Sequence, residues 1–265
     1  FNFIERLNEE KYEFKQGSWT VNKPIIVEGD LHISPGTNLR FAKNAYIIIK
    51  GSLTAIGDDS NPIILDAVLD SWKGVYVLNA DKKSHLKNVN ISNISSLEDG
   101  LLKLTGGITF YKSDVDIENV RIKNVEAEDA INIVESAFSL NSVFIDNTIS
   151  DGFDSDFSSG SITHSNLSNI GGDALDFSGS NVSIVNTKAS NVKDKAVSAG
   201  EKSDLNIENS QFINIGIGVA SKDGSVVNTS NTSILDYKLY GVMSYIKKDF
   251  YGSPKINISN STVSS

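Results

Sequence analysis

The chain has 265 residues, of which 39% are hydrophobic, so it is long enough to bury a large core within one folded unit. Its formal charge of −9 disfavours nucleic acid and anionic membrane surfaces as partners, and leaves cations, basic proteins and neutral glycans possible. Cysteine is absent and no apolar run reaches about 18 residues, so we expect neither disulfides nor membrane insertion.

Residues 25–57 alternate apolar and polar side chains, which is the pattern of short β-strands. This stretch reads IIVEGDLHISPGTNLRFAKNAYIIIKGSLTAIG, and Gly29, Gly36 and Gly51 mark its expected turns. The first part of the chain therefore predicts a series of strands separated by tight turns.

A repeat of about 22 residues organises the rest of the chain. Apolar residues recur at spacings of 22, 22, 22, 22 and 23, at Ile131, Phe153, Leu175, Val197, Val219 and Val242. A column of small residues stands just before them and predicts a bend or a close backbone approach, at Ala130, Gly152, Ala174, Ala196, Gly218 and Gly241. Each repeat ends on a residue that tolerates a left-handed turn and can bond to its neighbours, at Asn124, Asn147, Asn169, Asn191, Asn214 and Asp236.

Two insertions interrupt this register. Val75 and Ile108 are 33 residues apart, which predicts about 11 extra residues within NISSLEDGLLKLTGG, residues 93–107. A second insertion is expected near SYIKKDFYGSPK, residues 244–255. Inserted loops on a repeat protein often border its binding face.

Coils of 22 residues with about three short strands each are typical of a right-handed parallel β-helix. From about residue 25 to the end, the sequence resembles the pectin-lyase-like superfamily of parallel β-helix repeat proteins. We therefore expect an all-β, single-stranded right-handed β-helix over residues 25–265, as a single domain. Residues 1–24 are predicted to form an N-terminal cap, because an open coil end exposes unpaired strand edges.

The repeat places several aspartates on neighbouring coils. The column after the apolar one should face outward, and it reads Tyr76, Thr109, Asn132, Asp154, Asp176, Ser198, Ala220 and Met243. The column before the small residues contains Asp129, Asp151, Asp173 and Lys195, and a bend at the small residue would turn it outward as well. Four carboxylates, those of Asp151, Asp154, Asp173 and Asp176, should then lie within roughly 10 Å and repel one another.

The sequence leaves three explanations open for this acidic group. Lys195 could form a salt bridge with Asp173, and Asp129, Asp151 and Asp173 could cap turns, so that the group is purely structural. Alternatively, Asp151, Asp154 and Asp173 could bind calcium. In the third explanation Asp154 and Asp176 are a catalytic pair in which crowding raises one carboxyl pKa, and Lys195 assists them.

Catalytic motifs of related proteins do not settle the choice. Polygalacturonase-like members carry Asn-x-Asp, Asp-Asp, His-Gly and Arg-x-Lys in chain order, and alginate-epimerase-like members carry Asp-Pro-His-Asp; this sequence has neither series. Pectate-lyase-like members use calcium-binding aspartates with an Arg or Lys base, a role that the resemblance would give to Lys195. A lone lysine beside aspartates is more often a salt-bridge partner.

Together these patterns predict an exported protein, secreted, periplasmic or on a cell surface, that binds a polysaccharide, and they leave open whether it also cleaves or modifies it. If it is an enzyme, we expect a glycoside hydrolase, lyase or epimerase. The chain begins at Phe1 rather than Met, so we expect a soluble mature form without its signal peptide.

Trp72 and Tyr76 are the expected sugar-stacking residues, with Asn132, Asp173 and Ser198 as further substrate contacts. The rival prediction is a non-catalytic surface or assembly module whose acidic ladder is structural or calcium-bound.

Overall fold

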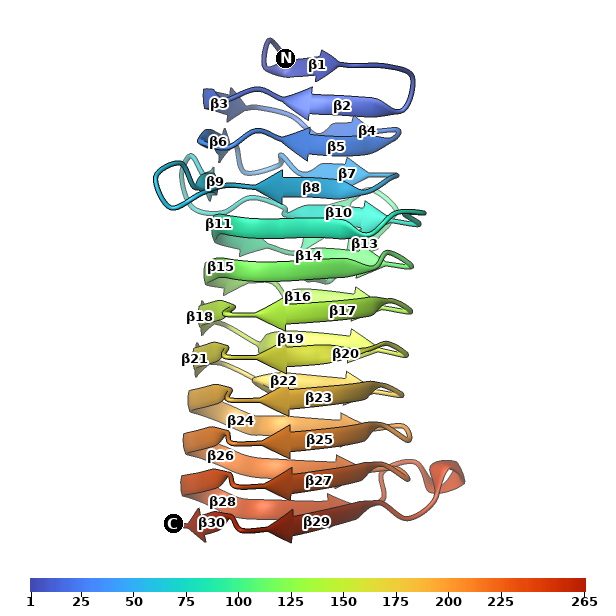
Figure 1. Cartoon of the computed structure of the whole chain (residues 1–265), viewed down its shortest axis with the longest axis vertical. Helices are drawn as coiled ribbons and strands as arrows, with labels where there is room; N and C mark the ends of the chain where they lie inside the picture. The colour runs from blue at the N-terminus through green and yellow to red at the C-terminus, as the bar shows by residue number, and fades with distance from the viewer.

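The computed structural model describes residues 1–265 and is a right-handed parallel β-helix (Figure 1). About 10 turns of about 23 residues each follow one another along a single axis. Helix is limited to one 3-10 turn at Asp249–Tyr251. The predicted fold class is confirmed.

Each turn contributes strands to three stacks, in which every strand pairs in parallel with its equivalents in the turns before and after it. The first stack carries the aspartates. It contains β4 (Ile25–Val27), β7 (Ile47–Ile49), β10 (Val75–Leu78), β14 (Gly106–Tyr111), β16 (Asp129–Val134), β19 (Asp151–Asp156), β22 (Leu175–Ser178) and the last parts of β24 (Lys188–Gly200), β26 (Gln211–Lys222) and β28 (Ser233–Tyr245).

The second stack faces the viewer in Figure 1. It contains β2 (Lys11–Phe14), β5 (Asp30–Ile33), β8 (Leu53–Ile56), the first parts of β11 (Ser84–Ser95) and β15 (Val115–Glu126), β17 (Ala137–Asn141), β20 (Ser159–Thr163), β23 (Asn181–Val185), β25 (Asp204–Glu208), β27 (Val226–Ser230) and β29 (Lys255–Ser259).

The third stack completes each turn. It contains β3 (Gly17–Val21), β6 (Thr37–Phe41), β9 (Ile63–Ala67), the last parts of β11 and β15, β18 (Phe144–Thr148), β21 (Asn166–Ile170), the first parts of β24, β26 and β28, and β30 (Thr262–Ser264).

The predicted apolar column lines one side of the core, which side chains of all three stacks fill. Ile131, Phe153, Leu175, Val197 and Val219 pair in register from coil to coil and are buried. The small residues before them are needed because a Cβ on Gly152 would lie 2.8 Å from the Ala174 carbonyl oxygen, and one on Gly218 would lie 2.2 Å from that of Gly241. The repeat read from the sequence is therefore the structural repeat.

Side-chain ladders hold the turns. The predicted asparagines have φ values between 53° and 61°, and Asn147 donates to Asn124 at 2.9 Å and Asn214 to Asn191 at 2.7 Å. A second ladder, which the sequence analysis missed, consists of buried serines after the first stack. In it the backbone N–H of Ser158 donates to Ser180 Oγ at 3.1 Å, and that of Ser180 to Ser203 Oγ at 3.0 Å.

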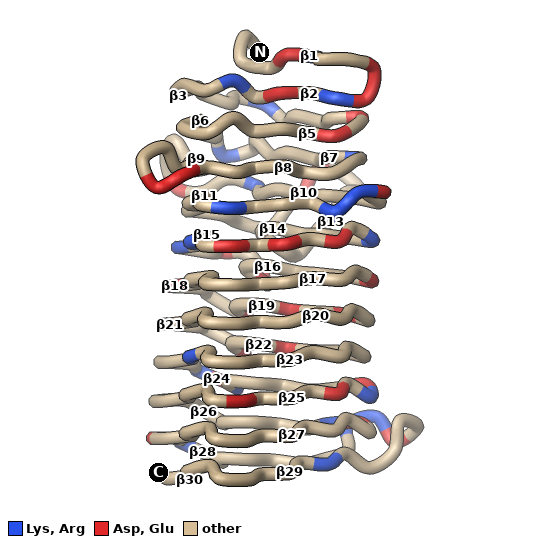
Figure 2. Tube along the Cα trace, in the orientation of Figure 1, with Lys and Arg blue, Asp and Glu red and all other residues tan.

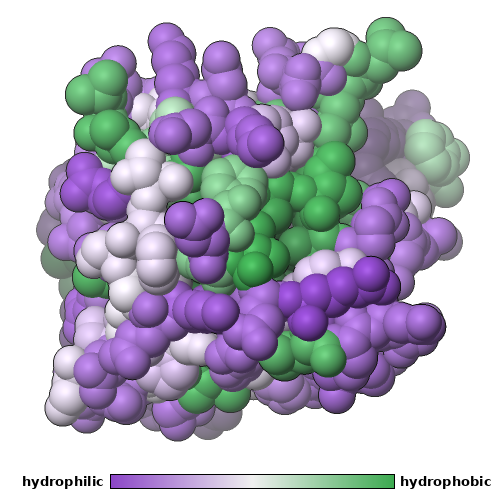
Figure 3. Space-filling model, turned by 90° about the horizontal axis from the view of Figure 1, so that it is seen from above, coloured by the Kyte–Doolittle hydropathy of each residue, from purple (hydrophilic) through white to green (hydrophobic).

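The N-terminal end is closed by β1 (Ile4–Arg6), which pairs antiparallel with β2. Within residues 1–24, the predicted cap, β2 and β3 already pair in parallel with β5 and β6, so only the residues before Lys11 lie outside the coils. Seen from this end, apolar side chains remain visible between polar rims (Figure 3), and Phe1 and Leu7 are exposed.

Both insertions lie where the register placed them. The first forms a hairpin of β12 (Leu97–Asp99) and β13 (Leu102–Leu104), which packs Leu97 with Tyr46, Ile48 and Tyr76 on the first stack. The second projects from the last coils (Figure 1) and contains the 3-10 turn. It is anchored through Asp223 Oδ1, which accepts the backbone N–H groups of Lys247 and Lys248 at 2.6 Å each.

Candidate functional site

The outer face of the first stack carries the predicted polar column. Asn132, Asp154, Asp176 and Ser198 pair directly from strand to strand, from β16 to β24. They point away from the core because their chain neighbours Phe153, Leu175 and Phe177 are buried in it. Figure 2 shows the acidic segments of β19 and β22 at this level of the coil.

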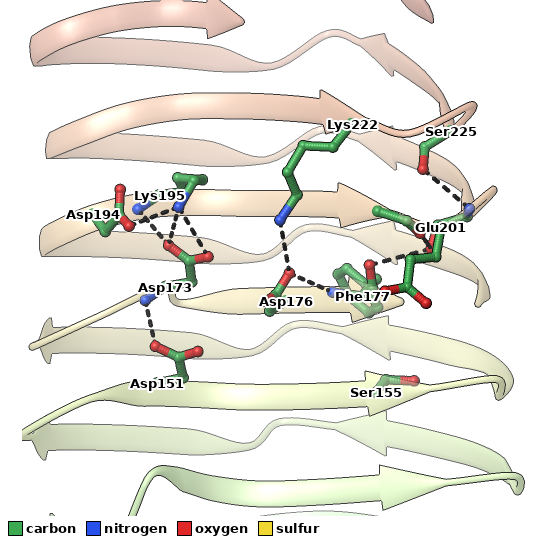
Figure 4. Close-up of polar contacts among 12 residues, drawn as sticks. Asp151, Ser155, Asp173, Asp176, Phe177, Asp194, Lys195, Glu201, Lys222 and Ser225 are labelled. Atoms are coloured by element: carbon green, nitrogen blue, oxygen red, sulfur yellow. Dashed lines mark hydrogen bonds and ion pairs between the residues drawn. The ribbon is translucent and has the colours of Figure 1, made fainter. Parts of the chain in front are cut away.

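Asp151 and Asp173, which precede the small residues, also lie on this face, as expected if the chain bends at the small residue. Carboxylate oxygens of Asp151, Asp173 and Asp176 lie within 4.8 Å of one another (Figure 4). Asp151 Oδ1 accepts the backbone N–H of Asp173 at 2.8 Å, and Asp173 Oδ1 accepts that of Lys195 at 2.9 Å. Asp151 and Asp173 thus each bond the backbone of the next coil, as the structural explanation requires.

We call the whole group the acidic cluster. It consists of seven carboxyl groups on the outer face of the first stack and at the turn after it, those of Asp129, Asp151, Asp154, Asp156, Asp173, Asp176 and Glu201. The charges of Glu128 and Asp194, beside it, also raise pKa values within the cluster. Asp129 and Asp173 are each only 5% exposed. The side chain of Asp129 makes no hydrogen bond within the protein, which distinguishes it from Asp151 and Asp173.

Three lysines approach the acidic cluster, and each is already paired. Lys195 Nζ lies 3.1 Å from Asp173 Oδ1 and 2.6 Å from Asp194 Oδ2. Lys222 Nζ lies 3.8 Å from Asp176 Oδ1, and Lys248 pairs with Glu201 (Figure 4 shows the first two lysines). Burial works against the charge of Lys195, but its pKa is raised by Asp173 and Asp194.

Burial and mutual repulsion change the protonation of two aspartates. Desolvation, reinforced by the charges of Asp129 and Asp156, raises the pKa of Asp154 to about 9. Desolvation and Asp151 raise the pKa of Asp129 to about 8. At neutral pH both groups therefore hold a proton and can donate it.

Asp176, unlike Asp129, is bonded within the protein. Its Oδ1 accepts the backbone N–H of Phe177 at 3.0 Å and lies 3.8 Å from Lys222 Nζ. Because Asp154 and Asp176 occupy the same position on adjacent strands, their backbones are about 4.8 Å apart. Two carboxyl groups on neighbouring strands in such different surroundings can divide the roles of acid and nucleophile in a glycosidase.

The other expected substrate contacts divide into two groups. Asn132 Nδ2 donates to Asp154 Oδ2 at 2.9 Å and Ser198 lies next to Asp176, so both belong to the site. Trp72 instead fills a core corner, stacked on Phe41 at 3.9 Å between ring centroids, and Tyr76 is covered by the β12–β13 hairpin. Both rings are 0% exposed, so neither is available to stack on a sugar.

Sequence reasoning missed Asp156, Glu201, Lys222 and Lys248 as members or partners of the acidic cluster. Asp156 was within reach of it, because it lies two residues after Asp154 and the outward positions of a strand alternate. Lys222 was within reach in the same way, because it lies two residues after Ala220 of the outward column. Lys248 comes from the second insertion, and no repeat position connects it to Glu201.

Three carboxyl groups are close enough to hold a metal ion, but they are not the set predicted for calcium. The structure groups Asp176, rather than Asp154, with Asp151 and Asp173, at a spacing that could hold a metal ion. Lys195 Nζ, however, lies 3.1 Å and 3.3 Å from the two oxygens of Asp173, and calcium needs six to eight oxygen ligands. An ammonium group already supplies the positive charge at this place.

Comparisons with known proteins describe the fold. No protein-family model matches the chain, and no curated protein sequence matches it. A catalytic domain of a GH87 α-1,3-glucanase, solved in complex with tetrasaccharides, superposes with a TM-score of 0.51 and 12% identity over 96% of this chain. The chain has a pectin-lyase-like fold.

Two further solved structures are similar to this β-helix. A mutant of the periplasmic alginate epimerase AlgG matches with a TM-score of 0.45 and 9% identity, over 99% of this chain and 80% of that chain. The Dettilon tailspike protein matches with a TM-score of 0.40 and 14% identity, over 94% of this chain. The β-helix spans 54% of the glucanase chain and 52% of the tailspike chain. No helix in it is long and apolar enough to cross a membrane.

Proposed function

We propose that this β-helix binds a polysaccharide across the outer face of its first stack and cleaves it with Asp154 and Asp176. The observation that carries the proposal is the pairing of Asp154, a buried carboxyl group whose pKa is raised to about 9, with Asp176 on the next strand, which faces the Lys222 ammonium group and a backbone N–H. Asp154 would donate its proton to the leaving glycosidic oxygen, and Asp176 would attack or stabilise the sugar carbon. Asn132 would hold Asp154 through its 2.9 Å hydrogen bond.

Lys195, Asp151 and Asp173 have a supporting role in this proposal. Their bonds join consecutive coils beneath the reacting pair, so they fix the strand spacing that sets the distance between Asp154 and Asp176. Lys195 is engaged by two carboxylates and is not assigned a proton-transfer step.

Asparagine substitutions test the proposal. Asp154→Asn and Asp176→Asn should each lower the release of reducing ends from the true polysaccharide by at least about a hundredfold, because each removes one of the two reacting groups. The melting temperature should stay level in Asp154→Asn, which replaces a group that is already neutral at pH 7, and should not fall in Asp176→Asn, which removes one carboxyl group from a crowded set. Screening the purified protein against a polysaccharide panel identifies the substrate first. Asn variants that cleave at the normal rate, or melt several degrees lower, would exclude the pair.

A non-catalytic surface or assembly module is the second candidate, favoured by the bonds that Asp151, Asp173 and Lys195 make along the coils. It predicts that the protein binds a glycan or a surface without releasing reducing ends or unsaturated products. Either function acts on extracellular material, so we also propose a secreted, periplasmic or cell-surface location, which fractionation of the source cells checks.

A further inference from the structure

The charge balance of the acidic cluster selects among glycans. Seven carboxyl groups, of which Asp129 and Asp154 keep their protons at neutral pH, face three lysines. Each lysine is already within ion-pair distance of a carboxylate: Lys195 of Asp173, Lys222 of Asp176 and Lys248 of Glu201. Arg121, the arginine nearest in the sequence, is exposed on β15 and stacks on Phe144 on the third stack. The cluster therefore has no uncommitted cation with which to bind an acidic sugar.

Two buried hydroxyl groups flank the reacting pair without partners. Thr109 Oγ1 and Ser198 Oγ accept or donate no hydrogen bond, although the residues are only 5% and 0% exposed. Both stand in the outward column, Thr109 beside Asn132 and Ser198 beside Asp176, so they mark the two ends of the site. Because both oxygen atoms are covered, a ligand meets the neighbouring Asn132 and Asp176 rather than these hydroxyl groups.

The carboxyl group of Asp129 adds to this pattern. It is 5% exposed, makes no hydrogen bond and lies close enough to Asp154 to be the first charge that acts on it. A negatively charged ligand brought to this place would be repelled by Asp151, Asp156 and Asp176 with no compensating pair, and would be excluded.

We infer that the site takes a glycan chain of neutral sugars and rejects chains that carry carboxylate or sulfate groups. The inference rests on the proposed function, and it adds the substrate class: hydroxyl groups are bonded by Asn132 and by the unpaired carboxyl group of Asp129, and acidic groups are excluded by the cluster. Charge, rather than shape, sets this selection.

Matched polymer pairs test the inference. Each neutral polysaccharide of the panel is compared with its own derivative in which the primary hydroxyl at C6 has been oxidised to a carboxylate, by titration calorimetry at low salt. The neutral member should bind and the oxidised member should bind at least about tenfold more weakly, a difference that shrinks in 0.5 M salt as screening increases.

Asp156→Asn provides the reciprocal test, because the Asp156 side chain makes no hydrogen bond and its removal lowers the negative charge of the cluster. This variant should regain part of the affinity for the oxidised polymer, whereas Asp204→Asn, an exposed position on the second stack, should not.

An oxidised or sulfated polymer that binds as tightly as its neutral parent would overturn the inference alone. An amine-bearing polymer that binds more tightly than its acetylated parent would also overturn it, since the site would then select positive charge. Binding to no member of any pair would overturn the proposed function together with it.

Discussion

At the scale of single residues, the acidic cluster combines two kinds of aspartate that look alike in the sequence. Asp151 and Asp173 accept backbone N–H groups and belong to the coil-to-coil bonding. Asp129 and Asp154 accept none, hold their protons at neutral pH and leave a donor on the surface. The two kinds respond differently to pH and to substitution, which makes them separable by experiment.

Stability should fall as pH rises from about 4 to about 9. The pKa of Asp154 is about 9 and that of Asp129 about 8 in the folded protein, against about 3.9 for an unfolded aspartate, so the native state binds more protons across this range. The stabilisation is complete below about pH 4 and is lost as pH approaches 9. Thermal melts of the wild type and of Asp154→Asn check this, and the variant should show the shallower decline. A melting temperature that rises from pH 5 to pH 9 would contradict it.

Lys195→Met should destabilise the protein by about 3–5 kcal/mol at pH 8, because it leaves the Asp173 carboxylate buried without its cation. The loss should disappear below about pH 5. The pKa of Asp173 is raised to about 6 by burial and by Asp176, and removing the lysine raises it further, so the group is neutral in both proteins at acid pH. Denaturant titrations at pH 5 and pH 8 measure the difference, and an equal loss at both values would argue against the ion pair as its cause.

At the scale of elements, the turns carry information that the strands do not. The strands of one stack differ in sequence and share only their alternation, while the serine ladder repeats the same bond on consecutive coils from Ser113 to Ser225. Each ladder joins a coil to the next one and fixes the stagger of the strands that follow it. The alignment of Asp154 with Asp176 on adjacent strands therefore depends on the bonds made at these turns.

Ser180→Ala should cost about 1–3 kcal/mol, because it leaves the buried backbone N–H of Ser158 without an acceptor. Ser139→Ala, on the outer face of β17, removes the same atom where it makes no hydrogen bond and should change stability by less than about 0.5 kcal/mol. Chemical denaturation of the two variants provides the comparison. If the two variants were equally stable, the serine ladder would not contribute to the free energy of unfolding.

At the scale of the whole molecule, the β-helix depends on an unbroken apolar column. Leu175 lies between Phe153 and Val197 in register and is 1% exposed. A change at Leu175 therefore disturbs the packing of the coils on both sides of it. One coil cannot fold alone, and the stack should melt as a single unit.

Leu175→Asp should therefore unfold the protein, since it places a charge in this column at a cost of several kcal/mol. Ser161→Asp, which adds the same charge on the outer face of β20, should leave the fold intact. Far-UV circular dichroism and thermal melting distinguish the two variants. A Leu175→Asp protein with an unchanged spectrum and melting temperature would be incompatible with the observed register.

The sequence by itself determined the repeat, the class of fold, the position of both insertions and the column that holds Asn132, Asp154, Asp176 and Ser198. It did so because a parallel β-helix pairs equivalent residues of successive coils, so that a linear spacing of 22 residues becomes a spatial neighbourhood. Two columns could be read in this way without any knowledge of packing.

Only the tertiary structure decided which aspartates are bonded and which are free, and which aromatic rings are covered. Trp72 is enclosed by Phe41 and Tyr76 by the β12–β13 hairpin, and Lys222 and Lys248 reach the acidic cluster from other coils. These outcomes depend on side-chain direction at bends and on segments distant in the chain. Local alternation carries no information about either, because burial and pKa arise from every neighbour in space.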